Sequence, residues 1–420
     1  MVRAAYSLFL YVISPAIFLH LWLRGQKASA YKKRWAERLG FYANPPKTGS
    51  LVIHCASVGE IMAASPLIKQ LMIRFPAQNI TITCNTPTGS EQIAKIFGDS
   101  VQHIYLPFDF HGSVKRFLNK LRPTAIIILE TELWPNLILQ SKQRVVPVLV
   151  INARLSEKSL RRYQLVSPLS RSLMHSITML AGHNQEDVER FKHLGLQDEQ
   201  ADVVGSIKFD IQLSDQAKNR AKQLKERLSG YEFVWVAGST HPREHEQVIT
   251  AHRLLCDKHK KSLLIIAPRH PEQFEETAEL ICDANMTFAR WSNNDLAGQT
   301  VLLADAMGEM LTFFGAANCA FIGGSLIDRG GHNPLEAAAF AIPVMTGPSY
   351  YNFKHIYPQL IAKNACTEVD GPDALCEQLA TYANSSEQAK RQGEEALKIV
   401  ASHCGAIEKT LNILTPYMAK

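Results

Sequence analysis

Short apolar segments alternate with longer amphipathic segments along most of the chain, and this alternation constrains the fold more than any other feature. The apolar segments are rich in valine, isoleucine and leucine without a sustained two-residue alternation, which is typical of strands covered on both faces. Strands separated by helices predict a parallel sheet. The expected strands form a first set (51–56, 80–84, 102–106, 125–129, 147–151, 178–181 and 201–204) and a second set (233–237, 263–267, 301–303, 319–322 and 343–346).

The two sets of expected strands indicate two α/β domains. A polar, helical stretch at residues 211–230 separates the sets, and a length of 420 residues fits two domains at about 100–200 residues each. We therefore predict an N-terminal α/β domain at residues 25–210, a linker at 211–230 and a C-terminal α/β domain at 231–420. Ligands of such sheets bind at the carboxyl ends of the strands, so we expect a ligand cleft between the two domains.

The first 24 residues are predicted to form a membrane anchor helix. Residues 4–23 carry no formal charge, and a helix of that length can just cross a bilayer core of about 30 Å. A basic cluster from Arg24 to Arg38 follows directly, and such clusters stay on the cytoplasmic side and attract anionic lipid. We expect an uncleaved helix that crosses the membrane or lies in its plane. The alternative is a buried helix of the globular body, because Pro15 and His20 weaken a membrane span.

Charge and motif content exclude several classes of protein. Residues 1–50 hold eight basic side chains and one acid, so the net charge of +6 belongs to this end, and nucleic acid is not an expected partner. A hydrophobic share of 46% and a charged share of 20% exclude a disordered chain. The eight cysteines include no CxxC pair, and the chain has no HExxH and no GxxxxGK[ST]. We predict neither a metal site nor a bound cofactor.

Acidic residues follow two of the expected strands in the first domain. Glu60 comes after strand 51–56 in a Ser-Val-Gly-Glu turn, at the start of an amphipathic helix. It is either a carboxylate that complements the helix dipole or a catalytic base aimed into the cleft. Glu130 and Glu132 follow strand 125–129, where two unpaired carboxylates are costly to bury. The alternative is that both acids only mark a helix entry before Pro135.

Other charged residues and several glycine-rich turns also follow expected strands. Lys208 comes after strand 201–204, and a surface salt bridge to Asp210 is its simplest interpretation. Glycines before helix starts, as at 323–325 and 330–331, leave backbone N–H groups for a phosphate, and Arg269 can add a fork of donors. Glu336 could accept from two ribose hydroxyls. A single Gly-Gly pair is often a plain turn, but several at successive strand ends favour a nucleotide site.

Seven segments, taken together and in this order, resemble the Kdo (3-deoxy-D-manno-octulosonic acid) transferases of lipopolysaccharide assembly. They are HCASVGE at 54–60, ETELWPN at 130–136, NARLS at 152–156, GSIKFD at 205–210, APRHPE at 267–272, MGEM at 307–310 and GGSLIDRGGHNPLEAAAFAIPVMTGP at 323–348. The resemblance covers nearly the whole chain, including the N-terminal helix. The last segment alone would indicate only the GT-B glycosyltransferase fold, so the expected architecture is of GT-B type, with two Rossmann-like domains and a cleft between them.

The resemblance implies transfer of Kdo from CMP-Kdo to a lipid A precursor, a tetra-acylated disaccharide bisphosphate. In the family this occurs at the cytoplasmic face of the inner membrane, with inversion and without a bound metal. Glu60 matches the family's general base, and Glu130 and Lys208 match positions that assist the transition state. The positions that match the family's CMP-binding segments are Pro268, Arg269, Gly308, Glu309, Met310, Asn333, Pro334, Leu335 and Glu336.

The sequence departs from the family in one loop. After Gly-Ser-Thr-His at 238–241 the family commonly has Gly-Glu-Glu, whereas Pro242, Arg243 and Glu244 follow here, which puts any role of this loop in doubt. Two other functions stay open. One is a different enzyme of the same fold that uses a UDP-sugar, either a glycosyltransferase or a 2-epimerase. The other is a non-enzymatic lipid-binding or assembly protein at the membrane, against which the Glu60 turn and the nucleotide-type loops argue.

Overall fold

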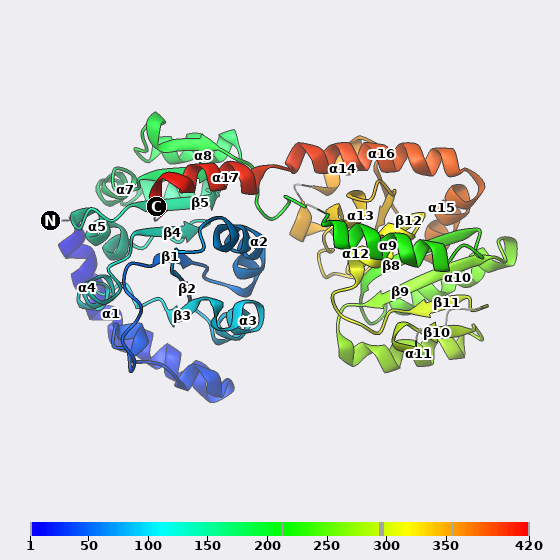
Figure 1. Cartoon of the computed structure of the whole chain (residues 1–420), viewed down its shortest axis with the longest axis horizontal. Helices are drawn as coiled ribbons and strands as arrows, with labels where there is room; N and C mark the ends of the chain where they lie inside the picture. Colours follow the sequence, from blue (N-terminus) through cyan, green and yellow to red (C-terminus); the bar gives the residue numbers. More distant parts are fainter. Residues whose placement is uncertain (1, 212, 294–297, 355, 419–420) are drawn as a thin grey trace. The chain divides into compact units, whose positions relative to one another are not determined.

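The structure, a computed structural model, describes residues 2–211, 213–293, 298–354 and 356–418. The chain forms two units, each built on a seven-stranded parallel sheet (Figure 1). The first unit contains residues 1–210 together with 405–420, and the second contains residues 211–404. Two parallel α/β sheets and one N-terminal apolar helix confirm the predicted fold class.

The first sheet has the strand order β3-β2-β1-β4-β5-β6-β7. The direction of winding therefore reverses between β1 and β4, and ligands of open parallel sheets bind at the carboxyl ends of the strands at such a reversal. The strands are β1 (Leu51–His54), β2 (Ile80–Cys84), β3 (Gln102–Tyr105), β4 (Ala125–Leu129), β5 (Val148–Ala153), β6 (Met179–Gly182) and β7 (Ala201–Val203).

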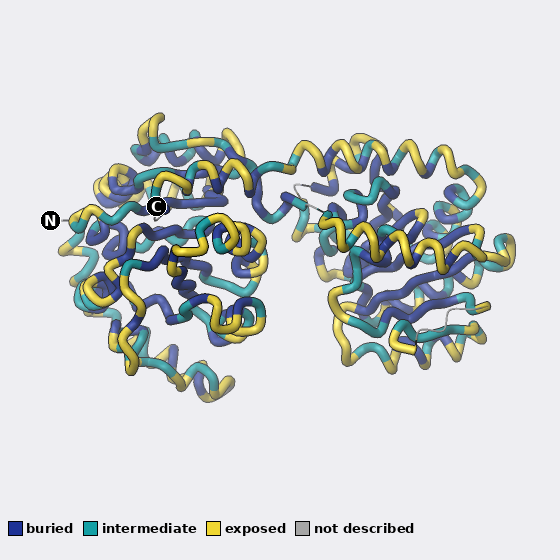
Figure 2. The backbone as a smooth tube through the Cα atoms, in the orientation of Figure 1, coloured by how far each residue is buried: buried dark blue, intermediate teal, exposed yellow. Residues whose placement is uncertain are grey.

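Helices cover both faces of the first sheet because alternate strand residues point to opposite faces. In β1, Leu51 and Ile53 belong to one buried cluster, while Val52 between them belongs to the other. Figure 2 shows the strands buried and the outer sides of the helices exposed. One face is covered by α2 (Val58–Arg74), α3 (Pro87–Phe97) and α17 (Ala406–Leu414), and the other by α4 (His111–Leu121), α5 (Pro135–Gln143), α7 (Ser167–Met174) and α8 (Gln185–His193), with α6 (Glu157–Gln164) beside α7.

Helix α1 (Val2–Lys27) is the one helix in the described part of the chain that is long and apolar enough to cross a membrane, over residues 3–26. Only 11% of its apolar window is buried, so the alternative of a buried core helix is wrong. Part of the helix packs on the first unit, where the Ser7 hydroxyl donates to Asn136 Oδ1 at 3.1 Å and the Tyr11 ring stacks on Phe110. Large apolar side chains elsewhere on the helix are exposed: Leu8, Phe9, Val12, Leu19, Trp22 and Leu23.

The second sheet has the order β10-β11-β9-β8-β12-β13-β14, with its reversal between β8 and β12. Trp235 of β8 and Phe321 of β12 are fully buried in its core. The strands are β8 (Phe233–Thr240), β9 (Ser262–Pro268), β10 (Phe288–Arg290), β11 (Val301–Leu303), β12 (Cys319–Ile322), β13 (Val344–Thr346) and β14 (Cys366–Glu368). The helices are α9 (Asp215–Arg227), α10 (His245–Lys258), α11 (Phe274–Asp283), α12 (Met310–Ala316), α13 (Leu335–Ala338), α14 (Tyr357–Ala362), α15 (Pro372–Asn384) and α16 (Ser386–His403).

Two segments differ from the predicted division of the chain. Residues 211–230, predicted as a linker, contain α9, which packs on α12 so closely that a Cβ on Gly315 would lie 2.5 Å from the Cβ of Ala221. Residues 405–420, predicted in the C-terminal domain 231–420, belong to the first unit. There Leu411 of α17 is fully buried in the cluster that contains alternate residues of β1 and β5, because that face of the sheet needs a helical cover.

Candidate active site

Glu60 lies at the N-terminus of α2, directly after β1. The Ser57 hydroxyl accepts from the Glu60 N–H at 3.3 Å and donates to Glu60 Oε1 at 3.0 Å. The second carboxylate oxygen, Oε2, accepts from the Ala56 N–H at 2.8 Å. These bonds hold an almost fully buried carboxylate at the carboxyl end of β1, where the strand order reverses.

The surroundings of Glu60 raise the pKa of its carboxyl group. Burial is the main cause, and the carboxylates of Glu130 and Glu132 raise the pKa further, while the bonds from Ala56 and Ser57 lower it. A carboxylate with a raised pKa holds an accepted proton more strongly, as a general base must. The mutual effect also shows that these three acids share one neighbourhood of the first unit.

Glu130 follows β4, the strand next to β1, and pairs with Lys208. Lys208 Nζ lies 2.5 Å from Glu130 Oε1. The backbone of Glu130 has φ +56°, a left-handed conformation that costs a non-glycine residue about 1–2 kcal/mol. Strain of this kind is often found at functional sites, where the surrounding structure holds it in place. Glu130 and Lys208, predicted separately, thus lie together and near Glu60.

The predicted salt bridge between Lys208 and Asp210 is wrong. The Asp210 carboxylate accepts from the Gly405 N–H at 3.0 Å and from the Ile407 N–H at 2.6 Å. It therefore caps the start of α17, which explains why a short acidic side chain is present there. Lys208 pairs instead with Glu130, which follows β4 and lies 78 positions earlier in the sequence.

In the second unit, Pro268 and Arg269 lie at the carboxyl end of β9. Pro268 is the last residue of the buried strand, and the Arg269 N–H donates to the Thr240 carbonyl at 2.9 Å. The Arg269 charge opposes the rise that burial causes in the pKa of Glu336, and it helps to lower the pKa of His332. Arg269, His332 and Glu336 therefore share one neighbourhood.

Two histidines in this neighbourhood contact each other and were not among the predicted site residues. The Nε2 atoms of His241 and His332 are 2.9 Å apart, and the His270 ring centroid lies 5.8 Å from that of His241. Burial, aided by the surrounding cations, lowers the pKa of both His241 and His332 to about 4. Both rings are therefore neutral at pH 7, and one Nε2–H donates to the other. Their only signal in the sequence was a position beside glycine-rich turns.

The segment Asn333 to Glu336 forms the start of α13. Asn333 Oδ1 accepts from the Leu335 N–H at 3.1 Å, and Asn333 Nδ2 lies 3.5 Å from Glu336 Oε1. Pro334 and Leu335 are buried and fix the position of this turn. Helix α13 ends at Ala338 and has only four residues. Arg269 is therefore a stronger source of positive charge here than this helix terminus.

Gly308, Glu309 and Met310 lie between β11 and α12. Gly308 has φ +88°, and no atom lies within 4 Å of the place where a Cβ would be, so conformation rather than space favours glycine. Glu309 Oε2 pairs with Arg220 of α9 at 2.5 Å and accepts from the Thr312 hydroxyl at 3.2 Å. The carboxylate of Glu309 is thus engaged within the unit.

Glu244, in the loop that departs from the family pattern, organises the turn after β12. Its side chain is fully buried. Oε2 accepts from the N–H groups of Gly324 (2.7 Å) and His241 (3.3 Å), and Oε1 accepts from those of Ser325 (3.1 Å) and Leu326 (3.0 Å). The sequence could not reveal this role, because three of the four donors lie about 80 residues away along the chain.

Across the described residues, no group of three or more histidine, cysteine, aspartate or glutamate side chains could hold a metal ion.

Comparison with known proteins gives the family. The family model of 3-deoxy-D-manno-octulosonic-acid transferase (kdotransferase) matches residues 33–211. A 3-deoxy-D-manno-octulosonic acid transferase of Haemophilus influenzae is 38% identical over 424 residues, which cover 100% of this chain and 99% of that protein. One from Bordetella pertussis is 31% identical over 440 residues, 99% of each.

Solved structures show a similar fold. The UDP-GlcNAc 2-epimerase of Neisseria meningitidis bound to UDP-GlcNAc matches with a TM-score of 0.56 and 12% identity, over 88% of this chain and 100% of that one. A putative UDP-N-acetylglucosamine 2-epimerase from Listeria monocytogenes matches with a TM-score of 0.55 and 11% identity, over 88% and 97%. At such identities the likeness shows the fold alone, which is the expected GT-B type.

Proposed function

The chain belongs to the 3-deoxy-D-manno-octulosonic acid (Kdo) transferase family and is a glycosyltransferase, and from this membership we propose its substrates and mechanism. The proposed donor is CMP-Kdo, and the proposed acceptor is a lipid A precursor, the tetra-acylated disaccharide bisphosphate. The observation that carries the mechanism is the buried Glu60 carboxylate, with its raised pKa, beside the Glu130–Lys208 pair.

Glu60 is the proposed general base. A hydroxyl of the acceptor attacks the anomeric carbon of Kdo while its proton passes to a Glu60 oxygen. The bond between that carbon and the phosphate oxygen of CMP breaks, and its electron pair stays on CMP. Attack from the side opposite the departing phosphate inverts the configuration at the anomeric carbon. A positioned base of this kind contributes about 10²–10⁴-fold to the rate.

The second unit supplies the proposed donor site. CMP-Kdo carries a phosphate and a sugar carboxylate, and the Arg269 guanidinium can offer a fork of donors to either anion. Positive charge at the phosphate stabilises the negative charge that develops as CMP departs. Asn333 and Glu336 are proposed to bind the ribose, with Pro268, Pro334 and Leu335 fixing the turns. Gly308, Glu309 and Met310 are proposed to contact the nucleotide through their backbone. Metal independence is part of this proposal, since Arg269 supplies a cationic group for the phosphate.

The proposed location is the cytoplasmic side of the inner membrane. The exposed apolar side chains of α1 and the basic residues that follow it support binding to an anionic lipid surface. This location would bring the enzyme to an acylated acceptor. No nucleic acid is expected as a partner.

The test is release of CMP from CMP-Kdo by the full chain, with and without the tetra-acylated disaccharide bisphosphate. Wild type should release CMP only with the acceptor, with or without EDTA, and Glu60→Gln should lose about 10²–10⁴-fold in kcat while retaining CMP binding. Near-normal turnover by Glu60→Gln would refute the assignment of the base. The remaining alternative, a UDP-sugar as donor, predicts that UDP raises the melting temperature more than CMP does.

A further inference from the structure

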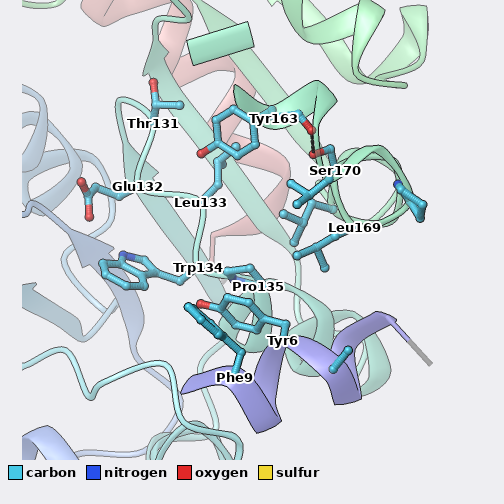
Figure 3. A pocket seen from close by; sticks show the side chains of 14 residues that line it. Tyr6, Phe9, Thr131, Glu132, Leu133, Trp134, Pro135, Tyr163, Leu169 and Ser170 are labelled. Atoms are coloured by element: carbon cyan, nitrogen blue, oxygen red, sulfur yellow. Dashed lines mark hydrogen bonds between the residues drawn. The ribbon is translucent and has the colours of Figure 1, made fainter. Parts of the chain in front are cut away.

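The first unit contains a pocket that the proposed chemistry does not use. Its volume is about 690 Å³, within the range of about 300–1,000 Å³ that is usual for small-ligand sites. Three segments line it: the start of α1, residues 131–135, which run from the loop after β4 to the first residue of α5, and the hairpin of α6 and α7 (Figure 3). All three belong to the first unit, so the pocket is formed within one unit of the chain.

The lining is apolar through most of the pocket. Phe9, Leu133, Pro135, Leu169 and Leu173 contribute carbon surface. In Figure 3 the rings of Tyr6 and Phe9 project from α1, while Leu169 lies on the wall formed by α7. An apolar cavity of this size suits a hydrocarbon ligand, because a polar one would lose its bonds to water without replacement.

Two of the polar residues that line the pocket, Thr131 and Glu132, lie at one end of it (Figure 3). They directly follow Glu130, which pairs with Lys208. The Glu132 carboxylate also raises the pKa of Glu60, so this end lies close to the proposed base. A ligand with an apolar tail in the pocket would therefore hold its polar end toward the carboxylates.

The wall formed by α1 connects the pocket to the exposed apolar surface of that helix. Phe9 lines the pocket and is itself 59% exposed, and its neighbours Leu8 and Val12 are 65% and 69% exposed. Within the described chain, α1 is the helix that is long and apolar enough to enter a membrane. On the opposite wall, α6 exposes Arg161 and Arg162, cations of the kind that attract lipid phosphates.

We propose that this pocket binds one fatty acyl chain of the acceptor lipid. The inference rests on the proposed function, because it takes the acceptor to be acylated. A chain that leaves the membrane along Phe9 fills the apolar lining, while the sugar with its reacting hydroxyl stays at the end near Glu130 and Glu132. The pocket thereby positions the acceptor and sets its KM, and it takes no part in the bond-making step.

Two pairs of substitutions test this role without changing the core. Ala5→Trp and Val166→Trp each place an indole in the pocket from an exposed position. Ala4→Trp and Leu165→Trp change the neighbouring exposed residues, which do not line it, and are the matched controls. We expect both blocking variants to raise KM for the tetra-acylated acceptor at least tenfold relative to their controls, with unchanged kcat and unchanged KM for CMP-Kdo. The same disaccharide bisphosphate without acyl chains should be used equally by all five proteins.

Unchanged KM for the acylated acceptor would overturn the proposal, and so would an equal rise with the deacylated one. If the blocking variants lose binding to phosphatidylglycerol vesicles while their KM for the acylated acceptor is unchanged, the proposal is also overturned. The pocket would then bind the phospholipid of the membrane and not the acceptor. Calorimetric titration of the acylated acceptor into detergent-solubilised full chain needs no turnover. If the blocking variants bind the acylated acceptor at least tenfold more weakly than their controls, the result supports the pocket. This holds even if the wild type transfers no Kdo, because absence of transfer refutes only the proposed function. Equal binding in the variants and the controls overturns the proposed pocket.

Discussion

Replacing Glu244 by alanine should destabilise the second unit severely, although the residue lies in the loop that departs from the family pattern. Its carboxylate is fully buried and accepts from four backbone N–H groups at 2.7–3.3 Å. A buried donor left without a partner costs about 1–3 kcal/mol. We count only the backbone N–H groups of residues 324–326 and take the lower cost, about 1 kcal/mol each, because water can enter the space left by the side chain. The free energy of unfolding should then fall by about 3 kcal/mol.

A loss of that size should be plain in thermal unfolding. For a unit of this size, 1 kcal/mol shifts the melting temperature by about 2–4 °C, so the expected fall is about 6–12 °C. The unfolding of the second unit can be followed by the fluorescence of Trp235, which is buried in that unit. Hydrogen exchange at the amides of residues 324–326 should accelerate. Glu246→Ala changes an exposed acid two residues away, in the first turn of α10, and should stay within about 0.5 kcal/mol of wild type. Unfolding of Glu244→Ala within 2 °C of wild type, or unchanged exchange at 324–326, would refute the reasoning.

Three further predictions rest on single features. Glu60 must be ionised to act as base, and its pKa is raised. As the pH is lowered, kcat/KM should therefore begin to fall at a pH above the usual pKa of glutamate, which gives the pH profile an acidic limb. Glu132→Gln removes a negative charge that raises this pKa, so the acidic limb of the kcat/KM profile should move to lower pH. An unchanged acidic limb would contradict the placement of Glu132 near Glu60. Leu411→Ala should cost about 2–5 kcal/mol in the unfolding of the first unit, whereas exposed Lys409→Ala should not, and equal effects would argue against α17 as a core helix. Arg243 has φ +69°, so Arg243→Gly should stabilise the second unit by about 1 kcal/mol; a lower melting temperature would show that no strain is stored there.

The strands of both sheets were largely predictable because most of them coincide with short segments that contain valine, isoleucine or leucine. The two strands that were not predicted, β10 and β14, are edge strands with the sequences Phe-Ala-Arg and Cys-Thr-Glu, which contain none of these three residues. The return of α17 to the first unit was not predictable either. An amphipathic pattern shows that a helix has a face to bury, but not which sheet will cover it.

The predicted site residues follow strands, and parallel sheets gather the carboxyl ends of their strands at one edge. Pairing between them was the part that the sequence could not show. Lys208 meets Glu130 across 78 positions of sequence, and His241 meets His332 across 91. Local patterns favoured nearer partners, as with Asp210, and those partners turned out to have other roles.

The two interpretations of Glu60, helix cap and catalytic base, are compatible in this structure. The capping bonds from Ser57 and Ala56 use one acceptor site on each carboxylate oxygen, and each oxygen has two. A site on each oxygen therefore stays available for the proton of an attacking hydroxyl, and the capping bonds fix the direction in which it points. A glutamate that only caps a helix is usually solvated and stabilised as the anion, which keeps its pKa low. Burial and two neighbouring carboxylates reverse that balance here. The features that suit Glu60 to the proposed role of base are thus its burial first, and then the carboxylates of Glu130 and Glu132, which follow the adjacent strand and lie outside the Ser-Val-Gly-Glu turn.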